Sequence, residues 1–502
     1  MKKWKKLNQL IKSTLSLLLA AAFLLCPCGA VYAQREQAVE NTASAPRSGA
    51  TVMEQTSEAV PIKVTCNAPR LNCNKMTDND EGTYETTNKK TVFTITSEKY
   101  FYNLYLKFEL PCIWKVTLPD DTVLNGGEYG FVHEYLPLGK AVRSVELTLP
   151  KGARFTDIYA FTDGTPPDWV QVWEPPCETA DLLVLPAHAD DEHLWFGGAL
   201  PYYAGELGYQ VQVVYLTNHN NATIRNHERL NGLWTVGVTH YPVIGDFLDV
   251  PETRSSLEDA ANIFGYEKVL IFQVEMLRRF KPKVVLGHDI NGEYGHGAHK
   301  LDAKTLLEAL ELTDDPDVFP ASSSKYGTCQ VQKCYLHLWK QNQITMYWSD
   351  IRLPKLGNRT ALEMAKAGFA CHKSQKLAVK VEESGPYDCR KFGLVYTTVG
   401  SDTPGENDMF EHVQWPEDAP PEIKTSDNIW DDVPEELRPS DSDLSPDSST
   451  NTQSVAKKGL SKDMVTLLLV TVGGIAVIAL FGWSVAAIQR RIQAKKGVNN
   501  KP

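Results

Sequence analysis

The sequence lacks an excess of basic residues. Its 51 lysines and arginines are outnumbered by 62 aspartates and glutamates, which gives the 502-residue chain a formal net charge of −11. Nucleic-acid-binding domains need a positive surface to attract phosphate, so we expect no nucleic-acid partner. The GxSxG turn of serine hydrolases and the HExxH helix of metalloproteases are also missing. Hydrolysis through an activated serine is therefore not expected.

The sequence also has no closely spaced CxxC pair, which argues against a structural zinc knuckle. Eight cysteines follow residue 33, and an even number suits disulfides in an exported chain. The sequence does not select among the possible pairings. These cysteines are Cys66, Cys73, Cys112, Cys177, Cys329, Cys334, Cys371 and Cys389.

The N-terminal segment follows the plan of a secretory signal. Lysines at positions 2, 3, 5 and 6 precede an apolar run from Leu17 to Leu25, and small residues follow, ending at Ala33. We therefore predict a signal peptide over residues 1–33. A lipid-modified Cys26 is the competing interpretation.

A second apolar segment, Met464–Ile488, contains no charged side chain. As a helix it would be roughly 37 Å long, enough to cross a hydrocarbon core of about 30 Å. We predict a single transmembrane helix over residues 464–488 and a basic cytoplasmic tail over residues 489–502. The exported N-terminus sets this orientation, so the predicted location is the cell membrane, with the globular part extracellular.

The first globular part covers residues 51–164, where short runs of alternating apolar and polar residues are separated by Gly, Asn, Asp and Pro. Examples are Thr91–Ile95 and Val145–Leu149. This pattern is typical of an antiparallel β-sandwich. The stretch Met76–Asp80 resembles discoidin-like galactose-binding jelly rolls, and a spacer role is the equal alternative. Residues 414–462, rich in Asp, Glu, Pro and Ser, are expected to form an extended linker.

Residues 178–413 show a different pattern, in which apolar runs alternate with helical stretches. We predict strands at Leu182–Leu185, Val211–Leu216 and Lys283–Leu286, and helices at Leu194–Leu207 and Asn226–Val236. Alternating strands and helices indicate an α/β fold with a Rossmann-like parallel sheet. Its ligand crevice would lie at the carboxyl ends of the strands.

Two predicted strands run directly into loops that contain metal-type ligands. The first reads AHADDE, Ala187–Glu192, and the second reads GHDINGEYGHGAH, Gly287–His299. A zinc hydrolase needs three protein ligands, an open coordination position and a nearby base, and the two loops together contain all of these residue types. A solvated acidic turn and two histidines on one helical face are the non-catalytic alternatives.

These residues resemble the PIG-L deacetylases, also called LmbE-like, over roughly Asp181 to Val413. This is a family of zinc-dependent de-N-acetylases that act on N-acetylglucosaminyl compounds. The first loop is similar to the family motif AHPDDE, with Ala189 in place of proline. The other similar positions are Tyr294-Gly295-His296 and His299, then Arg225, Glu228, Gly232 and Gly237, and finally His372-Lys373-Ser374-Gln375.

The resemblance implies a role for each matching residue. His188, Asp191 and His299 would be the metal ligands. Asp190 would be the general base that takes a proton from the attacking water and later protonates the leaving amine. His296 would stabilise the oxyanion with Tyr294 as a second donor, while Arg225 and Asp249 would contact sugar hydroxyls.

The chain departs from the family at Ala298, where many members carry an aspartate that tunes the first histidine of the pair. Asp289 and Glu293 are the nearest carboxylates in sequence that could replace it. The predicted function is therefore zinc-dependent deacetylation of an N-acetylglucosamine-type sugar in a surface glycan, glycolipid or cell-wall component. The alternatives are an inactive surface carbohydrate-binding protein and another zinc amidase, and the ligand set also suits other divalent transition metals.

Overall fold

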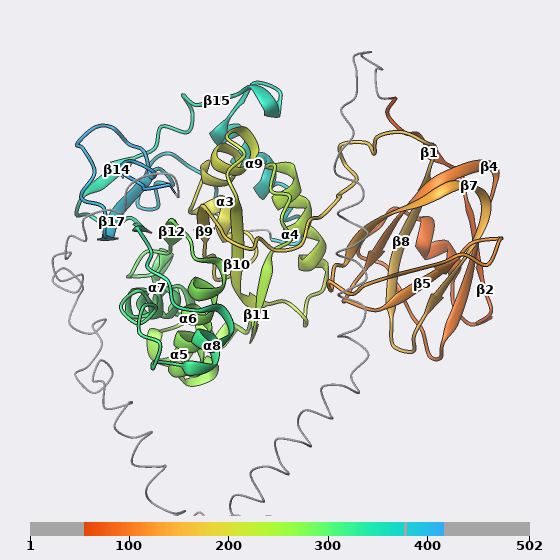
Figure 1. Ribbon diagram of the computed structural model, residues 1–502, viewed down its shortest axis with the longest axis horizontal. Helices are drawn as coiled ribbons and strands as arrows, with labels where there is room; N and C mark the ends of the chain where they lie inside the picture. Colours follow the sequence, from red (N-terminus) through yellow and green to blue (C-terminus); the bar gives the residue numbers. More distant parts are fainter. Residues whose placement is uncertain (1–54, 376–378, 416–502) are drawn as a thin grey trace, which may run out of the picture. The chain divides into compact units, whose positions relative to one another are not determined.

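The computed structural model describes residues 55–375 and 379–415 (Figure 1). The predicted signal peptide, the transmembrane helix, the cytoplasmic tail and nearly all of the linker lie outside these residues. Within the two described ranges, every helix is too short or too polar to cross a membrane.

Residues 59–161 form an eight-stranded sheet in which every strand pairing is antiparallel. Its central strands β4 and β7 are long enough to bend, with register shifts between Thr96 and Asn103, so the sheet folds over on itself. Alternate residues of β4, such as Phe93 and Ile95, are fully buried. The strands are β1 (Ala59–Val60), β2 (Lys63–Cys66), β3 (Glu85–Thr86), β4 (Thr91–Phe108), β5 (Trp114–Thr117), β6 (Val123–Gly126), β7 (His133–Leu149) and β8 (Arg154–Phe161).

The α/β part is built on a seven-stranded sheet with the order β11-β10-β9-β12-β13-β17-β14. The five strands from β11 to β13 are parallel, whereas β17 and β14 are antiparallel additions at one edge. The predicted α/β sheet is therefore confirmed, but it is mixed and not purely parallel. Its strands are β9 (Leu182–Val184), β10 (Val211–Asn218), β11 (Val243–Leu248), β12 (Val284–Gly287), β13 (Lys333–His337), β14 (Gln343–Thr345) and β17 (Lys391–Thr397).

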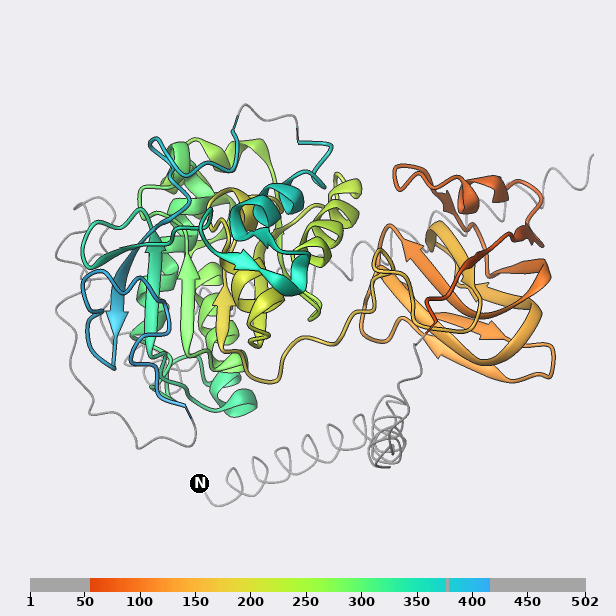
Figure 2. The same cartoon turned by 90° about the horizontal axis from the view of Figure 1, so that it is seen from above.

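Helices cover both faces of this sheet (Figures 1 and 2). Leu182 and Val184 of β9 pack into one apolar cluster with α3, α4 and α9, while Leu183 and Leu185 pack into another with α6 and α7. A strand buried on both faces needs a continuous apolar run, which explains the sequence Leu-Leu-Val-Leu. The helices are α3 (Asp191–Leu194), α4 (Ile224–Thr235), α5 (Leu257–Phe264), α6 (Tyr266–Phe280), α7 (Gly297–Leu310), α8 (Pro320–Tyr326) and α9 (Ala361–Phe369).

Short elements complete the α/β part. A two-stranded ribbon joins β15 (Arg352–Leu353) to β16 (Arg359–Thr360). Single 3-10 turns cover Pro251–Arg254, Glu293–Gly295 and Pro354–Leu356, and Cys73–Thr77 forms another next to the antiparallel sheet.

The continuous helix predicted for Leu194–Leu207 is wrong. The chain forms the four-residue helix α3, then an irregular segment, then a π-helical turn over Pro201–Glu206. Gly197 interrupts the helix because its φ is +53°, and a Cβ there would lie 2.7 Å from the Trp348 indole nitrogen. This left-handed turn lets the chain pass directly over a buried tryptophan.

The disulfides expected from the even number of cysteines are not present among the described residues. All eight cysteines listed above carry free thiols, and three of them, Cys177, Cys334 and Cys389, are buried. Burial raises the pKa of the Cys177 and Cys389 thiols to about 12, so both remain protonated at neutral pH.

Candidate metal centre and active site

The candidate site lies where the order of the parallel strands reverses. The chain runs from β9 outward to β10 and β11, then crosses to the other side of β9 to form β12. The loops after β9 and β12 therefore leave the sheet next to each other at the carboxyl ends of neighbouring strands. This is the place where open α/β sheets bind ligands, and it explains why the two motif loops meet.

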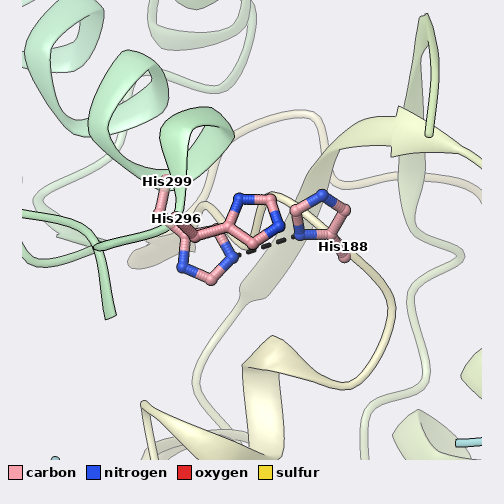
Figure 3. A group of neighbouring side chains, drawn as sticks. All are labelled: His188, His296 and His299. Atoms are coloured by element: carbon pink, nitrogen blue, oxygen red, sulfur yellow. Dashed lines mark hydrogen bonds between the residues drawn. The ribbon is translucent and has the colours of Figure 1, made fainter. Parts of the chain in front are cut away.

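Three donor atoms converge there. His188 Nδ1 lies 3.2 Å from His299 Nε2 (Figure 3). Asp191 Oδ2 lies 3.1 Å from His188 Nδ1 and 3.3 Å from His299 Nε2. Ligand atoms at the usual bond lengths from a tetrahedral zinc ion lie about 3.3 Å from one another. The three predicted metal ligands therefore have the spacing that a zinc ion needs.

Asp191 is held in place by two hydrogen bonds. Its Oδ2 accepts from the backbone N–H of His188 at 2.7 Å, and its Oδ1 accepts from the Trp195 indole at 2.8 Å. Burial alone would raise the pKa of this carboxyl group, but the facing histidines, His299 foremost, hold that pKa well below its ordinary value. Asp191 is therefore an anion at neutral pH, as a metal ligand must be.

Glu293 orients His299 from behind. Its Oε2 accepts from Nδ1 of both His288 and His299 at 2.8 Å, and its Oε1 accepts from His337 Nδ1 at 2.7 Å. Because His299 donates through Nδ1, its Nε2 presents a lone pair toward Asp191 and His188. The fully buried Glu293 thus fixes the tautomer that metal binding requires.

His288 lies beside the three donors but is already engaged. Its Nε2 is 3.5 Å from Asp191 Oδ2, yet this nitrogen accepts a hydrogen bond from the backbone N–H of Ala187 at 2.9 Å. The imidazole stacks on His299, with ring centroids 4.1 Å apart. His288 therefore supports His299, the predicted ligand, and its own Nε2 lone pair is already used.

Asp190, the predicted base, occupies a strained turn between the strand and α3. Its φ is +110°, which is unfavourable for a residue with a side chain. Its side chain is buried, and burial raises the pKa of the carboxyl group to about 8 although Arg225 opposes this shift. A carboxylate with a pKa near neutrality is suited to accept and return a proton.

Arg225 and Asp249, the predicted sugar contacts, support this turn. Arg225 donates to the carbonyl oxygen of Ala189, and its Nη2 lies 3.3 Å from Asp190 Oδ2. Its Nη1 donates to Asp249 Oδ2 at 3.2 Å. The other oxygen of Asp249 has no hydrogen-bond partner and lies 3.7 Å from His188 Nε2. Arg225 therefore holds the turn at Ala189 and Asp190, while Asp249 keeps one oxygen without a hydrogen bond.

His296 begins helix α7. Its Nδ1 accepts from the backbone N–H of Ala298 at 3.2 Å, which leaves the proton on Nε2. Burial, with His299 and His188 nearby, lowers the pKa of this imidazole to about 2, so the ring is a neutral donor. The Glu293 carboxylate binds the His299 imidazole, and Glu293 contacts His296 through a backbone hydrogen bond of 3.1 Å. The missing carboxylate at position 298 is thus replaced by a backbone cap.

Tyr294 lies at the outer edge of the site. Its side chain is 50% exposed, and its ring packs edge-on against His296 with ring centroids 5.5 Å apart. Trp195 and Tyr387 lie next to it. Within residues 55–375 and 379–415 the Tyr294 hydroxyl makes no hydrogen bond, so the ring forms an aromatic wall beside the donors.

The His-x-Ser-Gln segment packs against helix α4. Glu228 accepts two hydrogen bonds of 2.6 Å from Ser374, one from its backbone N–H and one from its hydroxyl. His372 lies against Glu192, at 3.4 Å. The segment therefore connects α4 and α9 to the first motif loop and contributes no donor to the triangle of His188, Asp191 and His299.

Four supporting residues were not identified from the sequence. His288 lies within the second motif loop, but nothing in the sequence separates its role from that of the ligands. His219 supports the first motif loop, because its Nε2 accepts from the Ala189 N–H at 3.2 Å. It follows strand β10, so its position after a third strand could have identified it from the sequence. Trp195 and His337 carried no such signal, because one follows the short helix α3 and the other is the last residue of strand β13.

Comparison with known proteins gives relatives that cover part of the chain. A 1D-myo-inositol 2-acetamido-2-deoxy-alpha-D-glucopyranoside deacetylase of Catenulispora acidiphila is 24% identical over 181 residues, which are 31% of this chain and 56% of that protein. Its counterpart in Saccharopolyspora erythraea is 28% identical over 177 residues, 29% of this chain and 58% of that protein. The chain thus spans a little over half the length of these curated relatives.

One solved structure similar to this chain is the N,N'-diacetylchitobiose deacetylase from Pyrococcus horikoshii. It is 18% identical, with a TM-score of 0.32, and the alignment covers 40% of this chain and 73% of that chain. No protein-family model matches the sequence.

Proposed function

We propose that the chain is a metal-dependent de-N-acetylase that acts on an N-acetylglucosamine-type sugar, with zinc as the native metal. The observation that carries this proposal is the triangle of His188 Nδ1, Asp191 Oδ2 and His299 Nε2, with all three edges between 3.1 and 3.3 Å. The similar deacetylases of Catenulispora acidiphila and Saccharopolyspora erythraea support the reaction class.

His188, Asp191 and His299 would hold the ion. When bound, zinc supplies Lewis acidity that makes water more acidic and polarises an amide carbonyl. Asp190 then accepts the proton of the attacking water and returns it to the leaving amine. Its raised pKa, about 8, suits both steps because the group must be a base first and an acid afterwards.

His296 stabilises the negative charge that develops on the amide oxygen. Since its Nδ1 accepts from the helix backbone, its Nε2 carries the proton and is the atom that donates. A neutral donor is effective here because it adds a hydrogen bond without bringing a second positive charge next to the metal. Tyr294 is the candidate second donor.

The aromatic wall supports a sugar as the substrate. Tyr294, which is 50% exposed, packs beside His299 and next to the half-buried Tyr387, while the buried Trp195 lies behind both rings. Sugar rings expose C–H groups that pack on aromatic faces, while the free oxygen of Asp249 is a hydrogen-bond acceptor for a hydroxyl group. These features support the sugar part of the proposed substrate.

We place this activity outside the cell, on a chain anchored by the segment 464–488. The signal-like N-terminus and the uncharged C-terminal segment motivate this part of the proposal. The substrate would then be part of a surface glycan, a glycolipid or a cell-wall polymer.

The test uses the full-length chain. Bound metal is measured by plasma emission, and released amine is measured with N-acetylglucosamine, N,N'-diacetylchitobiose and an N-acetylglucosaminyl inositol. We expect amine release that stops on chelation and returns with Zn²⁺. His299→Ala should lose both the metal of this triangle and activity, whereas the exposed-residue control His412→Asn should keep both. Chelator-insensitive release, or full activity in His299→Ala, would refute the metal mechanism.

A further inference from the structure

A second group of metal-type side chains lies behind the motif loop. Glu192 and His193 belong to α3, and His372 follows α9. The three side chains are completely buried, with an exposed fraction of 0% each. None of them belongs to the triangle of His188, Asp191 and His299.

The donor atoms of this group have no hydrogen-bond partners. Glu192 Oε1, His193 Nε2 and His372 Nε2 are all unpaired in the interior, and so are the Nδ1 atoms of both histidines. Polar atoms buried without partners are unfavourable, and native structures rarely leave several of them together. Three unpaired donors that face one another therefore indicate a ligand that satisfies all three.

The spacing of these atoms identifies the kind of ligand. His193 Nε2 and His372 Nε2 each lie 3.4 Å from Glu192 Oε1. A separation of 3.4 Å matches the distance between two ligand atoms of a tetrahedral ion with bonds of about 2.0 to 2.1 Å. It is too long for a good N–H···O hydrogen bond. One carboxylate and two imidazoles are a donor set that binds zinc and neighbouring transition metals.

Two glycines leave room for the histidine rings. A Cβ on Gly232 would lie 2.7 Å from His193 Nε2 and 3.1 Å from His372 Nε2, and a Cβ on Gly368 would lie 2.4 Å from the His193 ring. Helices α4 and α9 therefore carry glycine where they face the two rings. A side chain at position 232 would fill the space between the donor nitrogens.

We propose that Glu192, His193 and His372 form a second, structural site for a divalent transition metal ion such as Zn²⁺. The Tyr215 hydroxyl, which is buried, unpaired and close to Glu192, is the remaining oxygen donor beside the group. The site is closed to substrate because every donor is buried. Its ion would tie α3 to the segment after α9.

The second site would act on the base through Glu192. The other oxygen of this side chain, Oε2, accepts from the backbone N–H of Asp190 at 2.8 Å. Asp190 is held at a φ of +110°, a conformation that persists only where the surroundings enforce it. An ion on Glu192 Oε1 would fix that carboxylate and thereby the strained turn.

Metal counting tests the proposal without relying on the reaction. The full-length chain, prepared without a histidine tag, is equilibrated with Zn²⁺ and desalted, and zinc per chain is measured by plasma mass spectrometry. We expect two ions in the wild type and in the control His412→Asn. We expect one ion each in His299→Ala and His372→Asn, and none in the double variant.

A second variant retains all three donor residues. Gly232→Ala adds one methyl group between the two histidines, and it should reduce the count from two ions to one while circular dichroism shows a folded chain. A zinc count that is unchanged from the wild type in both His372→Asn and Gly232→Ala would overturn the proposal, and so would a count that falls to zero in His299→Ala. These counts are interpretable even if no amine release is found with any sugar, so the two proposals fail separately.

Discussion

Replacing Glu293 by glutamine should weaken metal binding at the triangle of His188, Asp191 and His299 without altering any ligand. The Glu293 carboxylate accepts from three imidazole Nδ1–H groups. An amide has only one acceptor atom, so its NH₂ group must face either the His288–His299 pair or His337. In the first orientation His299 can relieve the clash only by moving its proton to Nε2, the atom that must bind the metal.

The expected loss of metal affinity in Glu293→Gln follows from what supporting partners of metal ligands typically contribute. Supporting partners of metal ligands are typically worth 10- to 100-fold in affinity, which corresponds to about 1.4 to 2.7 kcal/mol. Glu293 supports a ligand directly and is completely buried, so we expect the upper half of this range. The chain should also lose roughly 2 kcal/mol of stability, because the amide leaves a buried donor unpaired.

The assay is a competition titration of Zn²⁺ against a chromophoric chelator, with the wild type, Glu293→Gln and the exposed-residue control Glu406→Gln. If Glu293→Gln binds Zn²⁺ more weakly while its circular dichroism spectrum is unchanged, the effect comes from lost ligand orientation and not from unfolding. Equal affinity in all three chains, within about twofold, would refute the role assigned to Glu293.

Three further changes test other parts of the site and fold. Asp190→Asn should keep the metal and reduce amine release by about 10² to 10⁴-fold, measured at saturating substrate, because only the proton acceptor is lost. Trp195→Phe removes the indole donor to Asp191 and should weaken zinc binding by about tenfold in the same chelator competition. Burial raises the pKa of Glu134 from 4.5 to about 7, so its contribution to stability is present below pH 4.5 and is lost as the pH rises through 7. The free energy of unfolding of Glu134→Gln, relative to that of the wild type, should therefore rise by about 2 kcal/mol between pH 5 and pH 8. Urea denaturation at both pH values measures this difference.

The sequence predicts which side chains converge where a polar loop follows a strand. His188 and Asp191 lie just past β9, and His299 lies in the segment after β12, so the apolar runs before them locate them at the sheet edge. Spacing along the chain does not show which carboxylate supports which histidine. Glu293 and Asp289 were equal candidates, and only the fold shows that Glu293 reaches His299 while Asp289 accepts from Asn291.

The parts that could not be predicted depend on strand pairing or on single glycines. His337 meets Glu293 because β13 pairs with β12, which brings together residues 44 positions apart. The apolar pattern of Leu194–Leu207 suggests a helix, but Gly197 and the packing of Gly198 against Trp348 interrupt it. Such interruptions are set by tertiary packing and do not change the local periodicity.

The hydrogen bond between Glu293 and His337 also bears on how the protein matures. The three triangle donors lie between residues 188 and 299, but the strand that supports them, β13, is synthesised only at residues 333–337. During synthesis from the N-terminus, the donors therefore emerge from the ribosome before their support does. Because such long-range pairings form late in folding, tight metal uptake should follow completion of the central sheet. Truncated chains ending before residue 333 should then compete poorly for scarce metal.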